Sequence, residues 1–156
     1  MIKVLFVCLG NICRSPMAEA IFRQKVNGSG LEKKIYIDSA GTGDWHIGNR
    51  PHQGTLKILQ ENKIDSSNIL ARTVVKDDFN NFDYIIAMDT QNVKNLTKLK
   101  ENNSRGEIAR LLEYLPDSSV VDVPDPYFTG NFQEVYELVE EACQELLAYI
   151  KEKENL

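Results

Sequence analysis

The chain has 156 residues, of which 42% are hydrophobic and 26% charged, a composition typical of a globular domain with its own core. Its formal net charge of −5 argues against a broad electrostatic surface for nucleic acid, so any anion site must be local. The apolar run near the N-terminus is too short to span a membrane and lacks a secretory cleavage pattern. We therefore expect one domain over residues 1–156, located in the cytoplasm, with neither nucleic acid nor a membrane as a partner.

Strand-like and helix-like segments alternate along the chain. In chain order, hydrophobic periodicity predicts a strand at 2–7, a helix at 16–26, a strand at 34–38, a helix at 51–62, a helical turn at 76–80, a strand at 83–88, a helix at 90–99, a short strand at 108–112 and a long helix at 131–153. Loops are expected at 39–43 and 122–130, and 64–75 shows no clear pattern. This alternation predicts an α/β fold, a parallel sheet with right-handed crossovers and helices on both faces.

Several residues mark where these elements begin and which side they bury. Ser15 followed by Pro16 is typical of an N-cap and a first helical position, and Thr90 is expected to cap the helix that follows it. Leu56 is expected, with Leu59, to face the core. Cys143 lies on the apolar side of the last predicted helix, where packing is its expected role.

The strongest functional signal lies where the first strand meets the first helix. Cys8 ends the strand, a loop containing Gly10 follows, and Arg14 immediately precedes the helix start. A loop that ends at a helix N-terminus points backbone N–H groups at one spot, where an anion binds and a thiolate is stabilised. The planar fork of arginine fits two phosphate oxygens at once, which lysine cannot do. A thiol and an arginine in this arrangement indicate attack on phosphate.

Asp125 is the candidate proton donor. Pro124 and Pro126 restrict the backbone on both sides, so the carboxyl group is presented from a stiff loop. A phosphate ester needs a proton on its leaving oxygen, which a nearby carboxylic acid can supply. Without Cys8 and Arg14, an ordinary Asp-Pro turn would explain this segment equally well.

Other polar residues are candidates for holding the loop. Ligands of parallel α/β sheets bind beyond the carboxyl ends of the strands, and Cys8, Ser39 and Asp89 are all expected just past strand ends. Asn11 and Ser39 could form hydrogen bonds that hold the loop, and Ser15 could donate to the sulfur of Cys8. An ordinary turn or helix cap explains each of these three equally well.

The remaining candidates concern redox chemistry and the pocket wall. Cys13 is close enough along the chain to form a reversible disulfide with Cys8 under peroxide, although a small buried filler is the alternative. Trp45 and Tyr127 could wall an aromatic pocket, although single exposed aromatic residues are common. No cluster of metal-ligating residues stands out, so we expect no metal and no cofactor.

Two motifs resemble those of the low-molecular-weight protein tyrosine phosphatases: the nine residues from Cys8 to Pro16, and Asp125-Pro126-Tyr127. The resemblance covers nearly the whole chain, including Trp45 and Asp89. It implies a four-stranded parallel sheet with a phosphate-binding loop between the first strand and the first helix. It also implies hydrolysis of phosphotyrosine in proteins, and of small aryl phosphates, through a cysteinyl-phosphate intermediate, with inorganic phosphate as the product and no metal.

The resemblance also implies roles for individual residues. Cys8 matches the nucleophile, Arg14 the phosphate-binding arginine and Asp125 the general acid. Asn11, Ser15 and Ser39 match residues that brace the loop, and Cys13 matches a second, redox-active cysteine that protects the first. The expected substrate-binding residues are Leu9, Gly10, Asn11, Ile12, Cys13, Ser15, Trp45 and Tyr127.

Three alternatives bear on the substrate and the reaction. Related protein-arginine phosphatases usually carry threonine at position 12, so Ile12 favours phosphotyrosine. A thioredoxin-coupled arsenate reductase of this fold needs two more cysteines after the third strand; residues 83–103 contain none, and Cys143 lies too far along the last helix. A module that only binds phosphotyrosine would need neither the nucleophile nor the acid. Phe128 departs from the family, because many members carry a second tyrosine there.

Overall fold

The computed structural model describes residues 1–116 and 118–156. One sheet runs through the molecule, with strand order β2-β1-β3-β4, and every neighbouring pair is parallel. The strands are β1 (Ile2–Cys8), β2 (Ile35–Gly41), β3 (Tyr84–Ala87) and β4 (Glu107–Arg110). The predicted α/β fold with a four-stranded parallel sheet is confirmed.

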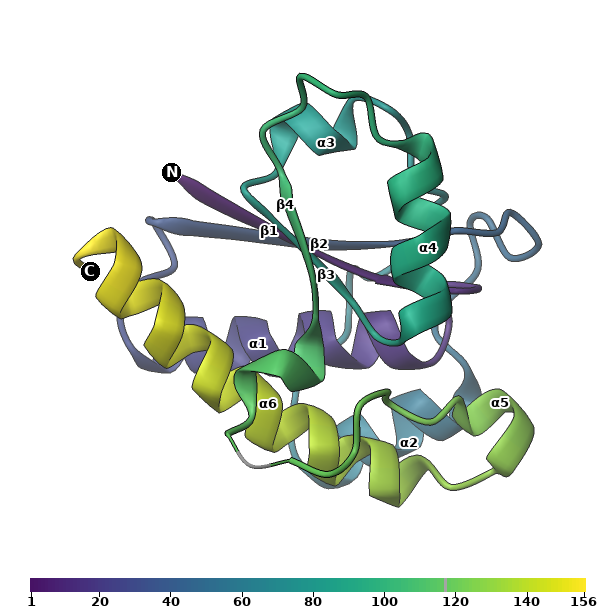
Figure 1. Ribbon diagram of the computed structural model, residues 1–156. Helices are drawn as coiled ribbons and strands as arrows, with labels where there is room; N and C mark the ends of the chain where they lie inside the picture. Colours follow the sequence, from purple (N-terminus) through teal and green to yellow (C-terminus); the bar gives the residue numbers. More distant parts are fainter. Residues whose placement is uncertain (117) are drawn as a thin grey trace.

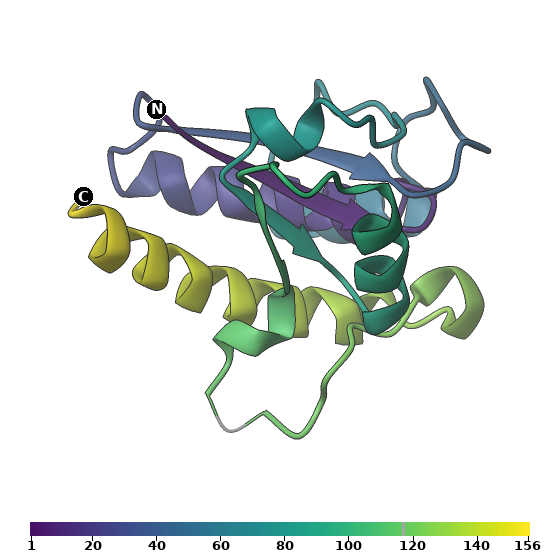
Figure 2. The ribbon, with the colours of Figure 1, turned by 45° about the horizontal axis from the view of Figure 1, so that its top comes forward.

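Helices cover both faces of this sheet, as predicted (Figure 1). On one side lie α1 (Arg14–Gly28), α2 (Gln53–Glu61) and α6 (Phe132–Glu154). On the other side lie α3 (Asp78–Asn81) and α4 (Thr90–Leu99), and the second view in Figure 2 shows the same two layers. The 3₁₀ helix η1 (Leu111–Tyr114) follows β4, and α5 (Pro126–Thr129) precedes α6. Among the described residues, none of the helices combines the length and apolar character that a membrane span needs.

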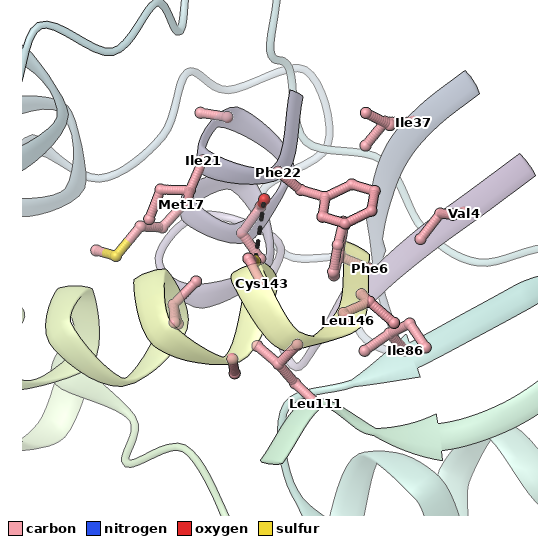
Figure 3. Packing of buried hydrophobic residues seen from close by; sticks show 14 of the residues in the cluster. Val4, Phe6, Met17, Ile21, Phe22, Ile37, Ile86, Leu111, Cys143 and Leu146 are labelled. Atoms are coloured by element: carbon pink, nitrogen blue, oxygen red, sulfur yellow. Dashed lines mark hydrogen bonds between the residues drawn. The ribbon is translucent and has the colours of Figure 1, made fainter. Parts of the chain in front are cut away.

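Strand β1 is buried on both faces, which explains why it reads as an unbroken apolar run. Val4 and Phe6 point toward α1 and α6, whereas Leu5 and Val7 join the cluster under α3 and α4. Figure 3 shows Val4 and Phe6 beside Phe22 of α1, and Cys143 of α6 facing α1. The Cys143 sulfur lies 4.0 Å from the carbonyl oxygen of Ala18, so this residue packs between two helices, as predicted.

The predicted N-cap residues of two helices are wrong, one by two positions and the other by one. Helix α1 begins at Arg14 with Cys13 at the N-cap, so Ser15 lies inside the first turn. Proline is tolerated at position 16 because the first N–H groups of a helix have no intrahelical acceptor. Helix α4 is capped by Asp89 rather than Thr90, because the Asp89 carboxylate accepts from the backbone N–H of Asn92.

Other boundaries also differ from the predictions. Residues 39–41 extend β2 instead of starting a loop, since Ser39 pairs with Phe6 across the ladder. Strand β4 ends at Arg110, and 111–114 form the 3₁₀ turn. The loop at 122–130 contains the short helix α5, and Leu56 is only half-buried because α2 turns Ile58 to the core instead.

The carboxyl ends of β1 and β2 lie at one end of the molecule. The loop at 9–13, the segment 42–52 and α5 gather there, on the right of Figure 1. The candidate residues Cys8, Arg14 and Asp125 therefore meet at the edge of the sheet where parallel folds bind ligands.

Candidate active site

The loop at 9–13 closes around the sulfur of Cys8. The backbone N–H of Asn11 donates to Cys8 Sγ at 3.3 Å, and Ser15 Oγ lies 3.0 Å from the same sulfur. Asn11 has φ of 57°, in the left-handed region that asparagine tolerates better than most residues. This backbone conformation turns the Asn11 N–H inward, toward the sulfur.

A network of side chains beneath the loop holds Asn11 in that conformation. Its Nδ2 donates to Ser15 Oγ at 2.7 Å and to Ser39 Oγ at 3.0 Å, while its Oδ1 accepts from the backbone N–H of Arg72 at 3.0 Å. The Ser39 hydroxyl in turn donates to Glu19 at 2.5 Å. Asn11, Ser15 and Ser39 are buried under the loop and do not line the cleft above it.

Two neighbouring elements fix the rest of the loop. A Cβ on Gly41 of β2 would lie 2.9 Å from the carbonyl oxygen of Leu9, so only glycine permits this close approach. On the other side, the backbone N–H of His52 donates to the carbonyl oxygen of Ile12 at 2.7 Å. The hydroxyl of Thr55 in α2 donates to the carbonyl oxygen of Cys13 at 3.0 Å.

Arg14 is buried at the first position of α1, with 2% of its surface exposed. Its Nη1 donates to Asp89 Oδ2 at 2.7 Å and to the carbonyl oxygen of Val123 at 2.9 Å, and its Nη2 lies 3.4 Å from Asp125 Oδ2. Burial by itself would lower the pKa of Arg14, but the charges of Cys8, Asp89 and Asp125 raise it above its usual value. The guanidinium is therefore a fixed positive charge beside the thiol.

One edge of the Arg14 guanidinium has unused hydrogen-bonding capacity. Its buried Nε finds no acceptor within residues 1–116 and 118–156. A buried N–H without a partner is costly, and such exceptions gather at functional sites. Nε and Nη2 lie on the same edge of the planar group, so together they can donate a bidentate pair of hydrogen bonds to an oxyanion.

A cleft of about 430 Å³ opens above Cys8. Its lining brings together most of the residues proposed from the sequence: Cys8, Leu9, Gly10, Ile12, Cys13, Trp45, Asp125 and Tyr127, joined by His46 and Phe128. Trp45, Tyr127 and Phe128 are exposed, so the wall of the cleft is aromatic and accessible from solvent. A flat aromatic substrate fits between these walls better than a small aliphatic one.

Cys13 also faces the cleft, but its environment differs from that of Cys8. Burial raises the pKa of the Cys13 thiol to about 12, and the charges of Cys8 and Asp125 add to this effect. Cys13 therefore stays a neutral thiol near pH 7. Both cysteines are free thiols in the structure.

Several residues of the site were not assigned a role from the sequence. Asp89 was placed only near a strand end, yet it orients Arg14. His46 lines the cleft, and His52 stacks on Phe132 at 5.1 Å between ring centroids. Glu19 shows no local signal, because a glutamate in a helix normally faces solvent.

Comparison with known proteins identifies the family. The family model described as "Low molecular weight phosphotyrosine protein phosphatase" matches residues 3–156. The low molecular weight protein-tyrosine-phosphatase YfkJ of Bacillus subtilis is 54% identical over 156 residues, which cover 100% of both chains. The crystal structure of YfkJ matches with a TM-score of 0.94 at 55% identity, covering 98% of this chain and 96% of that one. The enzyme PtpA of Staphylococcus epidermidis, with the same family name, is 47% identical over 156 residues, covering 100% of this chain and 98% of its own. The chain therefore belongs to the low molecular weight phosphotyrosine protein phosphatase family and is a hydrolase acting on phosphotyrosine.

Proposed function

We propose that this enzyme removes phosphate from tyrosine side chains of proteins, with Cys8 as nucleophile, Arg14 as phosphate ligand and Asp125 as general acid and base. The observation that carries this assignment is that Cys8 and Asp125 line one cleft and that the buried Arg14 lies close to both. Asp125 Oδ2 is 3.4 Å from Arg14 Nη2, the charge of Cys8 acts on the Arg14 guanidinium, and Arg14 Nε finds no acceptor within residues 1–116 and 118–156.

In the first step, the Cys8 thiolate attacks phosphorus and an S–P bond forms as the bond to the tyrosyl oxygen breaks. Asp125 gives its proton to that oxygen, so the product leaves as a neutral phenol. Charge develops on the three equatorial oxygens of the phosphoryl group. The N–H groups of the loop and the Arg14 edge are placed to stabilise it.

In the second step, water attacks the phosphocysteine. Asp125, now a carboxylate, takes a proton from that water, the S–P bond breaks, and inorganic phosphate leaves with the Cys8 thiolate restored. Ser15 and the backbone N–H of Asn11 contact the sulfur and stabilise its negative charge at this stage. Asp125 thereby returns to its protonated form for the next cycle.

Replacement of the nucleophile is the direct test of this assignment. Cys8→Ser should abolish turnover of p-nitrophenyl phosphate while the loop still binds phosphate, because its N–H groups and Arg14 remain. Phosphate binding is measured by isothermal titration calorimetry. Near-normal hydrolysis by this variant would overturn the proposal.

The role of Asp125 has its own signature in the leaving group. Asp125→Ala should lower kcat for phenyl phosphate by roughly 10²- to 10³-fold, because general acid catalysis contributes on that scale. The loss should be smaller for p-nitrophenyl phosphate, whose leaving group needs a proton less. If poor and good leaving groups are affected equally, Asp125 is not the acid.

Ile12 is the proposed determinant of phosphotyrosine over phosphoarginine. It lines the cleft and packs with Cys13 and Ala71. Peptides carrying phosphotyrosine, phosphoarginine or phosphoserine should be compared side by side for the wild type and Ile12→Thr. We expect phosphotyrosine to be preferred by the wild type, with the preference weakened in the variant. A wild type that turns over phosphoarginine faster refutes the assignment.

We also propose that residues 1–156 act as one domain in the cytoplasm. A thiol nucleophile must stay reduced, and the cytoplasm supplies reducing conditions. The expected partners are phosphotyrosine-containing proteins, and the acidic net charge of −5 disfavours a nucleic acid as a further partner. We expect no membrane partner and no cofactor.

A further inference from the structure

Glu19 is a buried carboxyl group that the reaction described above does not use. It lies on α1, with 5% of its surface exposed, behind the loop that holds Cys8. A carboxylate is rarely buried to this extent unless it is paired and hydrogen-bonded. Its two oxygens meet Ser39 Oγ at 2.5 Å and Arg23 Nη2 at 2.6 Å.

The direction of each hydrogen bond between Glu19 and Cys8 can be worked out from its partners. The backbone N–H of Arg72 can only donate, so the Asn11 atom that it meets is the amide oxygen. The Asn11 amide nitrogen therefore faces Ser15 and Ser39 and donates to both hydroxyl oxygens.

Each hydroxyl group then has one proton left to donate. The proton of Ser39 goes to Glu19, because an ionised carboxylate only accepts. When Cys8 is a thiolate, its sulfur can only accept, so the proton of Ser15 goes to that sulfur, 3.0 Å from its oxygen. Hydrogen-bond donation thus runs outward from the Asn11 amide along two branches, one through Ser39 to Glu19 and one through Ser15 to Cys8.

We propose that Glu19 is a positioning residue for the reaction at Cys8: by accepting the Ser39 proton, it keeps Ser39 an acceptor for Asn11 and so keeps the Ser15 hydroxyl donating to the thiolate. The proposal rests on the function proposed above, in which Cys8 is the nucleophile. Glu19 touches neither substrate nor sulfur and acts through the side chains of Ser39, Asn11 and Ser15.

The groups around Glu19 act on its ionisation in opposite directions. Burial raises the pKa of Glu19 above its usual value; Ser39 and Arg23 oppose that effect, and Asp38 of β2 adds to it. Protonated Glu19 would carry an O–H of its own and could donate to Ser39, which would reverse this link. The ionised form, held by Arg23, is the form that orders the network.

The groups that face Cys8 itself come from three elements. Arg14 and Ser15 lie on α1, the N–H of Asn11 and the thiol of Cys13 belong to the loop, and Asp125 faces the cleft from the start of α5. Removing Glu19 changes none of these groups directly. A change in thiol reactivity on Glu19 substitution therefore reports on the hydrogen-bond network.

Glu19→Gln replaces a carboxylate, which only accepts hydrogen bonds, with an amide that also donates, and it changes the side-chain volume little. Arg23 requires an acceptor, so the amide oxygen of the new side chain turns toward Arg23 and its NH₂ group toward Ser39. Ser39 Oγ then receives two donors, and its own proton has no acceptor. This arrangement competes with the bond from Asn11, loosens Asn11 from its left-handed conformation and weakens the bond from Ser15 to Cys8.

The test measures thiol reactivity directly. Wild type and Glu19→Gln are alkylated with iodoacetamide between pH 4 and 9, and the modification of Cys8 is followed by mass spectrometry. In Glu19→Gln we expect the midpoint of Cys8 reactivity to move up by roughly one pH unit, a tenfold loss of thiolate on the acid side. The acid limb of kcat/KM should move with it. Cys13 does not interfere, because burial keeps its thiol neutral in this range.

Matched variants separate positioning from stability. Glu140→Gln makes the same change in another carboxylate paired with α1, through Lys25 at 2.5 Å, and should leave the midpoint unchanged. Glu19→Asp keeps the charge and should move the midpoint less than Glu19→Gln does. Ser39→Ala breaks the same path at a neutral residue and should move the midpoint in the same direction, which keeps the test available if Glu19→Gln does not fold. Adding Glu19→Gln to Ser39→Ala should give no further shift.

Two results would overturn the proposal. One is a Glu19→Gln enzyme with the wild-type midpoint and wild-type kcat/KM. The other is a lower melting temperature with an unchanged midpoint, which would make Glu19 a structural residue only. In either case an inactive Cys8→Ser variant would show that the proposed nucleophile stands, so the two failures are distinguishable.

Discussion

Arg14→Lys is a sharp test of how the loop recognises phosphate, because it keeps the charge and removes the fork. In the structure, Nη1 is committed to Asp89 and to the carbonyl oxygen of Val123. The opposite edge, Nε with Nη2, is the one that can hold two phosphate oxygens. A lysine ammonium has three N–H bonds, and two of them would be taken by the same two acceptors.

The expected loss of activity follows from the number of N–H groups left to bind phosphate. The variant keeps one N–H for phosphate where arginine offers two on one edge, so at least one charge-assisted hydrogen bond is lost. Such a bond contributes about 2–3 kcal/mol, which corresponds to roughly a 30- to 150-fold loss in kcat/KM. If the bond is equally strong in the bound substrate and the transition state, the loss appears mainly in KM; if it strengthens in the transition state, kcat falls.

The assay is steady-state hydrolysis of p-nitrophenyl phosphate and of a phosphotyrosine peptide, with inorganic phosphate as a competitive inhibitor. Arg105→Lys is the control, because Arg105 donates to the carbonyl oxygens of Asn80 and Asn81, away from the cleft, and should stay within about twofold of the wild type. An Arg14→Lys enzyme within threefold of the wild type would show that the fork is not what binds phosphate.

Three further predictions follow from the site. Gly41→Ala places a methyl group 2.9 Å from the carbonyl oxygen of Leu9, so we expect a loss of about 1–3 kcal/mol in the free energy of unfolding and a fall in kcat/KM, whereas Gly28→Ala meets nothing within 4 Å and should cause neither change. Burial raises the pKa of Cys13 from its ordinary value of 9.0 to about 12. The contribution of the neutral Cys13 thiol to the free energy of unfolding is therefore complete below pH 9 and is lost as the pH rises toward 12. In urea titrations, the free energy of unfolding of the wild type should fall by about 2 kcal/mol relative to that of Cys13→Ala between about pH 8 and 10.5; the same pH dependence in both proteins would contradict this. Dialysis against a chelator should leave kcat/KM unchanged, because loop N–H groups and Arg14 supply the positive charge; loss of activity that zinc or magnesium restores would refute a metal-free mechanism.

The general fold could be predicted because its signals are local. Each strand of a doubly covered parallel sheet is an apolar run, and the helices between them show three- and four-residue spacing. Boundaries were less accurate where a polar residue lies inside an element. Ser39 was expected in a loop because serine favours turns, yet it belongs to β2, where Glu19 and Asn11 satisfy its hydroxyl group.

The proposed reactive centre stands out in the sequence, because most of its residues are close together along the chain. Cys8, the loop and Arg14 span seven positions, and only the link to Asp125 is distant. The supporting residues could not be found in this way. Asp89 holds Arg14 from 75 positions away, and Arg72 holds Asn11 from 61 positions away. These contacts exist only once the sheet brings the segments together.

The segment at 64–75, which shows no periodic pattern, illustrates why such support is hard to see. It makes one isolated bridge, between Gly41 and Thr73, instead of a ladder. Its backbone N–H at Arg72 is therefore available to the Asn11 side chain, whereas a regular strand would use that donor for its neighbour. The Arg72 guanidinium is tied to Asp38 and Asp78 at 3.0 Å each, and these contacts hold the irregular backbone in place. Irregularity here frees a backbone group to hold Asn11 in the loop at 9–13, so the absence of a secondary-structure signal follows from the contact that the segment makes.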